Sequence, residues 1–150
     1  MTALRIHHVG LTVASLQKSI DFYCDVLGFS VMERGEAAGG QTAVITGLDE
    51  VHILTADLSL PGGHILELIQ YLAPMGARRN ALTHEPGNTH IALQVADIAQ
   101  TYQRLKASNV VTRSAPITLQ DAGEFWSGTK VLYALDPDGR TVEIVEAVVG

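Results

Sequence analysis

The chain has 150 residues, of which 47% are hydrophobic and 17% charged, and its formal net charge is −6. This composition excludes a disordered chain, and the length predicts one domain or two small modules that share a core. No basic run is longer than Arg78-Arg79, which argues against nucleic acid and anionic membranes as partners. The single cysteine excludes an intrachain disulfide, and no apolar run approaches the roughly 18 residues of a membrane span. We therefore expect a protein of the cytoplasm.

A stretch near the start of the chain recurs in the second half. Residues 8–16 read HVGLTVASL, and residues 90–98 read HIALQVADI, so the two align without a gap. The alternation of apolar and polar residues predicts a strand in each copy, with His8 on the opposite face from Val9 and Leu11. The same alternation predicts that His7 points away from His8.

Each copy continues in the same way. Ser15 and Asp97 are candidate N-caps for helices over residues 16–29 and 98–110, where apolar residues recur at helical spacing. Shorter extended segments follow, and they read TAVITG (42–47), EVHILTADL (50–58) and KVLYALD (130–136). Each half then closes on a predicted strand with glycine at or near its start, GGHILELIQ (62–70) in the first half and DGRTVEIVE (138–146) in the second.

Each closing strand has a carboxylate among aliphatic residues. Glu67 and Glu143 align in the two strands, and they follow His8 and His90 by 59 and 53 residues. Both halves therefore read as β-α-β-β-β. We predict an α+β fold of two tandem βαβββ modules, residues 1–72 and 89–150, joined by a Pro- and Gly-rich linker over residues 73–88 into one compact domain.

The repeat predicts a metal site. If the modules pack around a pseudo-twofold axis, His8, Glu67, His90 and Glu143 converge on one point. Two imidazoles and two carboxylates suit one divalent transition metal such as Zn, Ni, Co, Mn or Fe. The cation would also neutralise carboxylates whose burial is otherwise costly. Taken singly, each glutamate is explained by a solvated strand face and each histidine by a hydrogen bond in the core, so the prediction depends on the repeat.

The segment from His8 to Phe29, HVGLTVASLQKSIDFYCDVLGF, resembles the N-terminal signature of glyoxalase I, and YALDPDGRTVEIVE (133–146) is also similar to this family. The chain thus resembles the vicinal oxygen chelate superfamily, which includes glyoxalase I, methylmalonyl-CoA epimerase, extradiol dioxygenases, fosfomycin-resistance enzymes and bleomycin-binding proteins. The resemblance implies that each module curls into half of an open barrel around a shared metal cleft.

The His/Glu/His/Glu set looks most like that of glyoxalase I and related lyases and epimerases. The resemblance implies a metal-dependent lyase or isomerase that transfers a proton next to a carbonyl, through a metal-stabilised enediolate, on a small molecule with adjacent oxygens. Glu143 and Glu67 would be its acid and base. Asp49 or Glu50 is an alternative second base, unless this pair is an ordinary solvated turn. Many relatives pair, so we expect a homodimer.

Two other functions stay open. Extradiol dioxygenases usually have a histidine where this chain has Phe125, which argues against that reaction. A non-enzymatic protein that sequesters an antibiotic would need aromatic residues for stacking, and the chain has only eight. Phe125 and Trp126 are candidate substrate contacts. Arg78 and Arg79 would bind an anionic substrate, or are simply solvated. The segment before His90, EPGNT (85–89), departs from the pattern that glyoxalase I has before its second metal histidine, which argues against a glutathione substrate.

Overall fold

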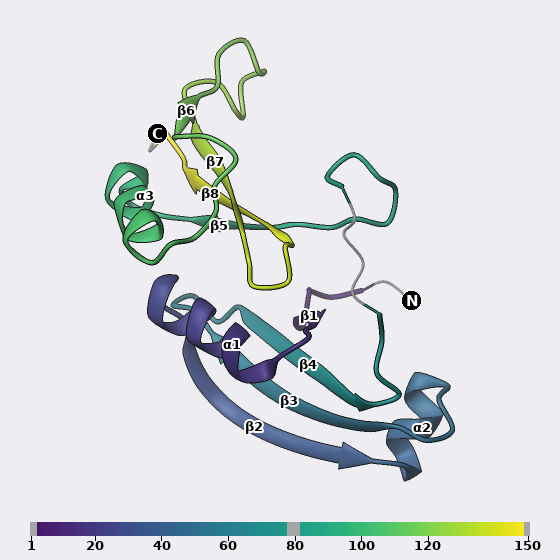
Figure 1. The fold of residues 1–150 in the computed structure, drawn as a ribbon. Coiled ribbons are helices and arrows are strands. Elements are labelled where there is room, and N and C mark those ends of the chain that lie inside the picture. Colours follow the sequence, from purple (N-terminus) through teal and green to yellow (C-terminus); the bar gives the residue numbers. More distant parts are fainter. Residues whose placement is uncertain (1–2, 78–81, 149–150) are drawn as a thin grey trace. The chain divides into compact units, whose positions relative to one another are not determined.

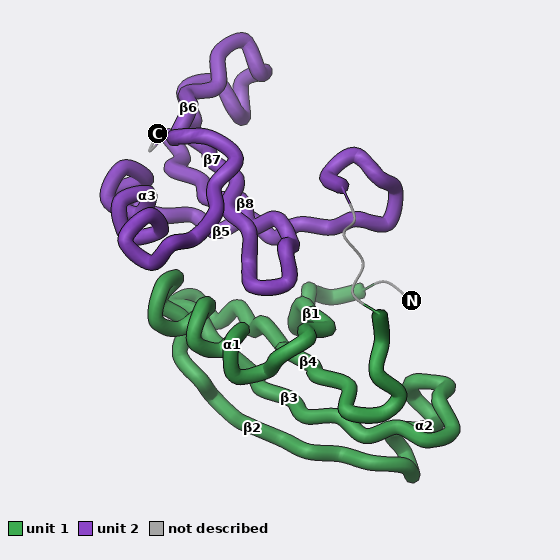
Figure 2. Tube along the Cα trace, viewed as in Figure 1, with its two compact units in different colours: residues 1–79 green, residues 80–150 purple. Residues whose placement is uncertain are grey.

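The computed structural model describes residues 3–77 and 82–148. The chain divides into two compact units, unit 1 (residues 1–79) and unit 2 (residues 80–150), which Figure 2 shows in different colours. Within the described ranges, the longest helix has ten residues, and no helix has the length and hydropathy needed to span a membrane.

Unit 1 contains one sheet with helices at its side and end (Figure 1). Its elements are β1 (Val9–Thr12), α1 (Leu16–Asp21), the π-helical turn η1 (Phe22–Val26), β2 (Ser30–Ala38), α2 (Gly40–Thr46), β3 (His52–Ser59) and β4 (Ile65–Ala73). The strand order is β1-β4-β3-β2. Strands β1 and β4 are parallel, and the other two pairings are antiparallel.

Unit 2 repeats this topology. Its elements are β5 (Ile91–Gln94), α3 (Ile98–Ala107), β6 (Ile117–Thr118), β7 (Lys130–Leu135) and β8 (Thr141–Glu146). The strand order is β5-β8-β7-β6, with β5 and β8 parallel and the remaining pairings antiparallel. The predicted α+β class and the tandem βαβββ modules are therefore confirmed.

In each unit, one face of the sheet packs against a helix. Helix α1 contacts β3 and β4, and α3 contacts β7 and β8. The side chains between helix and sheet are apolar and alternate along the strands, as with Leu66 and Leu68 on β4 and Leu132 and Ala134 on β7. Both helices begin at the predicted N-caps: Ser15 accepts from the Lys18 amide, and Asp97 accepts from the Gln100 amide.

The prediction of an extended segment at residues 42–47 is wrong, because residues 42–46 belong to helix α2 and Gly47 follows as its C-cap. Its β-branched residues favour a strand, but intrinsic β-propensity is weak and depends on burial. Val44 and Ile45 are 83% and 84% exposed, so no packing supports an extended conformation here. Gly47 ends the helix in the left-handed conformation, with φ 69°. The second strand of the unit lies earlier, at residues 30–38.

Candidate functional site

The first histidine and the first glutamate meet in unit 1. The parallel pairing of β1 and β4 places Gly10 beside Glu67, and His8 lies just before β1. His8 Nε2 is 3.4 Å from Glu67 Oε2, and the two side chains are 44% and 27% exposed. We refer to this pair as the first half-site.

The prediction that His7 points away from His8 is wrong. The Nδ1 atoms of the two rings are 2.9 Å apart, which is hydrogen-bonding distance. Strand β1 begins only at Val9, so the alternation of a strand does not extend back to these residues. The contact leaves Nε2 of His8 as the nitrogen that faces Glu67.

The second histidine and glutamate meet in unit 2 in the equivalent way. The parallel pairing of β5 and β8 places Ala92 beside Glu143, as Gly10 stands beside Glu67. His90 Nε2 is 3.2 Å from Glu143 Oε2, and the Glu143 side chain is only 12% exposed. We refer to this pair as the second half-site. The union of the two half-sites in one metal centre stays a prediction.

Strand alternation places both glutamates on the sheet face that is turned away from the helix. In β4, Leu66 and Leu68 are buried on the helix side, so Glu67 between them points to the other side. In β8, Val142 and Ile144 flank Glu143 in the same manner. We refer to these two sheet faces as the open faces. The carboxylates are half-buried there, and within the described residues no group of three or more His, Cys, Asp or Glu surrounds either one.

A buried aspartate shapes the turn that leads to Glu143. The Asp136 side chain is fully buried, and its Oδ1 accepts from the amides of Asp138 and Arg140. The guanidinium of Arg140 also donates to Asp136 Oδ2, at 3.2 Å. Gly139 has φ 81°, a conformation that suits glycine. These contacts hold the β7–β8 hairpin and so the register of Glu143.

Two residues opposite the glutamates were not found from the sequence. Asp57 on β3 pairs with Glu67, and Tyr133 on β7 pairs with Glu143. The Tyr133 ring lies 5.8 Å from the His90 ring, centroid to centroid. Burial first, and then the negative charge of Glu143, raise the pKa of the Tyr133 hydroxyl, which is therefore a neutral donor at pH 7. Each precedes its glutamate by ten residues, so the matched spacing marked both as candidates, but only the strand register shows that they stand opposite.

A second pair of equivalent contacts joins each of these strands to its helix. Gln70 and Glu146 follow the two glutamates by three residues and point to the helix side. Gln70 Oε1 accepts from the Leu16 amide at 2.6 Å, and Glu146 Oε2 accepts from the Ile98 amide at 2.8 Å. Each strand that bears a half-site glutamate thus also caps the first turn of the helix behind it.

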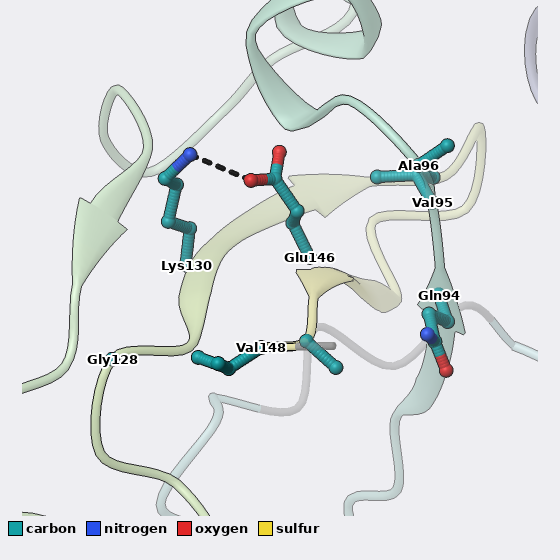
Figure 3. Close-up of a pocket in the computed structure, with 8 residues that line it drawn as sticks. Gln94, Val95, Ala96, Gly128, Lys130, Glu146 and Val148 are labelled. Carbon is teal, nitrogen blue, oxygen red and sulfur yellow. Dashed lines mark hydrogen bonds and ion pairs between the residues drawn. The ribbon is translucent and has the colours of Figure 1, made fainter. Parts of the chain in front are cut away.

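Unit 2 also contains an open cavity of about 680 Å³ (Figure 3). It lies at the end of the sheet where Lys130 Nζ contacts Glu146 Oε1 at 2.6 Å, and Gln94 and Val148 line another part of it. Neither His90 nor Glu143 belongs to its lining. The cavity is therefore distinct from the second half-site.

The other predicted site residues lie apart from the half-sites or outside the described residues. Phe125 and Trp126 form a T-shaped pair in the loop between β6 and β7, and they are 82% and 38% exposed. That loop joins the Lys130 end of β7, away from Tyr133 and Glu143. Asp49 and Glu50 lie in an exposed bend before β3. Arg78 and Arg79 lie outside the described residues.

Comparison with known proteins agrees with this architecture. The chain is 28% identical to a 2-epi-5-epi-valiolone epimerase from an Actinomyces species, over 99% of this chain and 82% of that protein. It is also 28% identical to a lactoylglutathione lyase of Neisseria meningitidis, over 95% of this chain and 91% of the enzyme. A solved glyoxalase family protein from Bacillus cereus has the same fold, with a TM-score of 0.86, 21% identity, and coverage of 99% of this chain and 97% of that one.

The match to a family extends over nearly the whole chain. The model of the Glyoxalase/Bleomycin resistance protein/Dioxygenase superfamily matches residues 5–144, a range that includes both half-sites and all eight strands except the last two residues of β8. The resemblance inferred from the sequence is thereby confirmed, and the chain belongs to this superfamily.

Proposed function

We propose that this protein is a metal-dependent lyase or isomerase that transfers a proton next to the carbonyl of a small molecule with adjacent oxygens. The observation that supports this most is the duplicated pair, His8 with Glu67 and His90 with Glu143, at equivalent register positions of two equivalent sheets. The relatives named above are an epimerase and a lyase, which supports the same class of reaction.

The donor set fits a divalent transition metal. Imidazole nitrogen and carboxylate oxygen are ligands that Zn and its neighbours bind in tetrahedral or octahedral sites. Glu67 and Glu143 are half-buried beside aliphatic residues, and a bound cation would offset the cost of desolvating them. When bound, such an ion polarises a substrate carbonyl and stabilises the negative charge of an enediolate.

The remaining steps fall to the side chains of the chain itself. Oε2 of each glutamate faces its histidine, so Oε1 is the oxygen that takes or returns a proton. We assign the first proton abstraction to Glu143, because it is the less exposed carboxylate and has the Tyr133 hydroxyl opposite it. Glu67 would supply a proton of its own, either to another carbon or to the opposite face of the substrate, and exchange with solvent would then remove the proton from Glu143 and restore the one on Glu67. Asp49 and Glu50 are the alternative to Glu67 in this role.

The first experiment measures metal content by elemental mass spectrometry, on protein purified without chelators or a histidine tag. We expect about one transition metal per chain in the wild type, and its loss in Glu67→Ala and in His90→Ala, because one ion needs ligands from both half-sites. Circular dichroism verifies that the variants are folded. Folded variants and wild type that all lack metal would overturn the proposal and favour a protein that sequesters a small molecule.

The second experiment tests the base. In the metal-loaded protein, Glu143→Gln keeps the size of the side chain but removes its basic oxygen. We expect proton exchange at carbons next to a carbonyl to fall by about 100-fold or more, as is typical when a general base is lost. Exchange is followed by NMR in heavy water. Unchanged metal content together with unchanged exchange would show that Glu143 is not the base.

A further inference from the structure

The open face of unit 1 carries a row of carboxylates that runs across three strands. Glu67 on β4 pairs with Asp57 on β3, and Asp57 pairs with Glu33 on β2. Directly paired residues of antiparallel strands point to the same face and lie about 5 Å apart. Glu67 belongs to the first half-site, so the half-buried Asp57 places a second negative charge next to it.

This row is not balanced by a cation from the sheets. In the eight described strands, the only lysine or arginine residues are Arg34 and Lys130. Arg34 is adjacent to Glu33 and so points to the helix side, where its guanidinium donates to Gln17 of α1. Lys130 pairs with Glu146, which caps α3 on the helix side of the other sheet. In the described strands, neither open face therefore carries a lysine or arginine that could pair with an anionic group.

The open face of unit 2 offers uncharged hydrogen-bonding groups instead. Tyr133 stands opposite Glu143 at the position where unit 1 has Asp57. Gln94 shares this face, because it pairs with Val145, two residues after Glu143. A phenol and an amide are suited to hydroxyl and carbonyl oxygens.

We infer that the substrate is an uncharged, hydroxyl-rich carbonyl compound, and that Asp57 is a specificity residue that disfavours substrates with an anionic group next to the reacting carbons. The inference rests on the proposed function, because it takes the half-sites as the place of reaction. Like charges a few ångströms apart at a partly buried site repel strongly, whereas neutral hydroxyl groups donate hydrogen bonds to the same carboxylates.

Two small probes test this inference. Hydroxyacetone and 3-hydroxypyruvate both carry a hydroxymethyl ketone, but the second has a carboxylate in place of a methyl group. Proton exchange of each probe in heavy water is measured with metal-loaded protein and divided by the uncatalysed rate. We expect a larger rate acceleration for hydroxyacetone. Dissociation constants of both probes, from ligand-observed NMR titrations, are expected to favour hydroxyacetone and give a readout that does not need turnover.

The decisive variant is Asp57→Asn, which keeps the shape of the side chain and removes its charge. We expect it to improve binding and exchange of 3-hydroxypyruvate relative to hydroxyacetone by roughly 5- to 30-fold, the range for a charge about 8 Å away in a partly solvated site. Asp25→Asn is the matched control, because Asp25 is exposed on η1. This variant makes the same change in net charge and should leave the ratio unaltered.

The outcomes separate the two proposals. The inference is wrong if Asp57→Asn leaves the binding and exchange ratios of the two probes as in wild type. It is also wrong if wild type prefers 3-hydroxypyruvate. A double substitution of Arg78 and Arg79 by alanine would then test the linker arginines as the anion site. If neither probe exchanges, but binding favours hydroxyacetone in an Asp57-dependent way, the proposed reaction is wrong and the charge selectivity holds.

Discussion

Small residues, glycine in unit 1 and alanine in unit 2, stand beside the two half-site glutamates. A Cβ added at Gly10 would lie 3.5 Å from Glu67 Oε2, an ordinary contact, and Ala92 occupies the equivalent place in unit 2. Gly35 is different. A Cβ there would lie 2.7 Å from Thr55 Oγ1, closer than carbon and oxygen can approach without a shift.

Gly35 and Gly10 should therefore respond differently to substitution by alanine. Gly35→Ala should lower the free energy of unfolding by about 1 kcal/mol or more, because β2 or Thr55 must move. Gly10→Ala should change it by less than about 0.5 kcal/mol. Urea unfolding followed by circular dichroism measures both. In the double variant Gly35→Ala with Thr55→Ala the loss should largely disappear, and a loss that persists there would assign it to another neighbour.

At the scale of elements, each helix is tied to the strand that bears a half-site glutamate. The strand side chain that accepts from the first amide of the helix is a neutral amide in unit 1, Gln70, and a carboxylate in unit 2, Glu146. In unit 2 the Ile98 amide and then Lys130 lower the pKa of the Glu146 carboxyl, and Glu146 in turn raises the pKa of Lys130. A depressed carboxyl pKa means that the folded state favours the ionised form.

The contacts of Glu146 with the Ile98 amide and with Lys130 predict that Glu146→Gln lowers the free energy of unfolding in a pH-dependent way. The contribution of an acid with a lowered pKa is present above its ordinary value of 4.5 and is lost as the pH falls through the lowered pKa. The contribution of Lys130 is present below its ordinary value of 10.5 and is lost as the pH rises through the raised pKa. Wild type should thus be more stable than Glu146→Gln at pH 7, and the gap should close in acid.

Urea unfolding at several pH values measures the gap between wild type and Glu146→Gln. Glu124→Gln is the control, because Glu124 lies exposed in the loop between β6 and β7. A gap of the same size at pH 3 and pH 7 would show that the ion pair and the helix cap do not contribute through the charge of Glu146.

For the whole molecule, the question is whether one ion links the two units. Trp126 is the only tryptophan and belongs to unit 2, so its fluorescence reports on the unfolding of that unit. Zinc should raise the unfolding midpoint of unit 2 in wild type. If Glu67 of unit 1 is a ligand of the same ion, Glu67→Ala should remove much of this rise, since about 100-fold weaker binding removes about 2.7 kcal/mol of stabilisation.

Asp25→Asn, in unit 1 like Glu67, serves as the control and should keep the full zinc effect. A zinc effect on Trp126 fluorescence that survives Glu67→Ala would contradict a shared centre. It would instead indicate that His90 and Glu143 bind the ion without help from unit 1.

Much of the architecture could be predicted from the sequence, because it is recorded in patterns that are local along the chain. The recurrence of HVGLTVASL and HIALQVADI identified two modules, and alternation identified their first and last strands. The capping residues Ser15 and Asp97 marked the helix starts, because a cap is a contact over three residues. Helix α2 was missed, since its β-branched residues favour a strand and only the surrounding chain decides otherwise.

By itself, then, the sequence determined the family, the two βαβββ modules and the pairing of each histidine with a glutamate as a candidate, since these follow from repeated residue types at matched spacing. Only the tertiary structure decided which side chains stand opposite the glutamates, Asp57 in one sheet and Tyr133 in the other. It also decided that Gln70 and Glu146 cap the helices behind them. The physical reason is that strand register and helix docking join residues far apart in the chain, and a shift of one residue would turn each side chain to the other face.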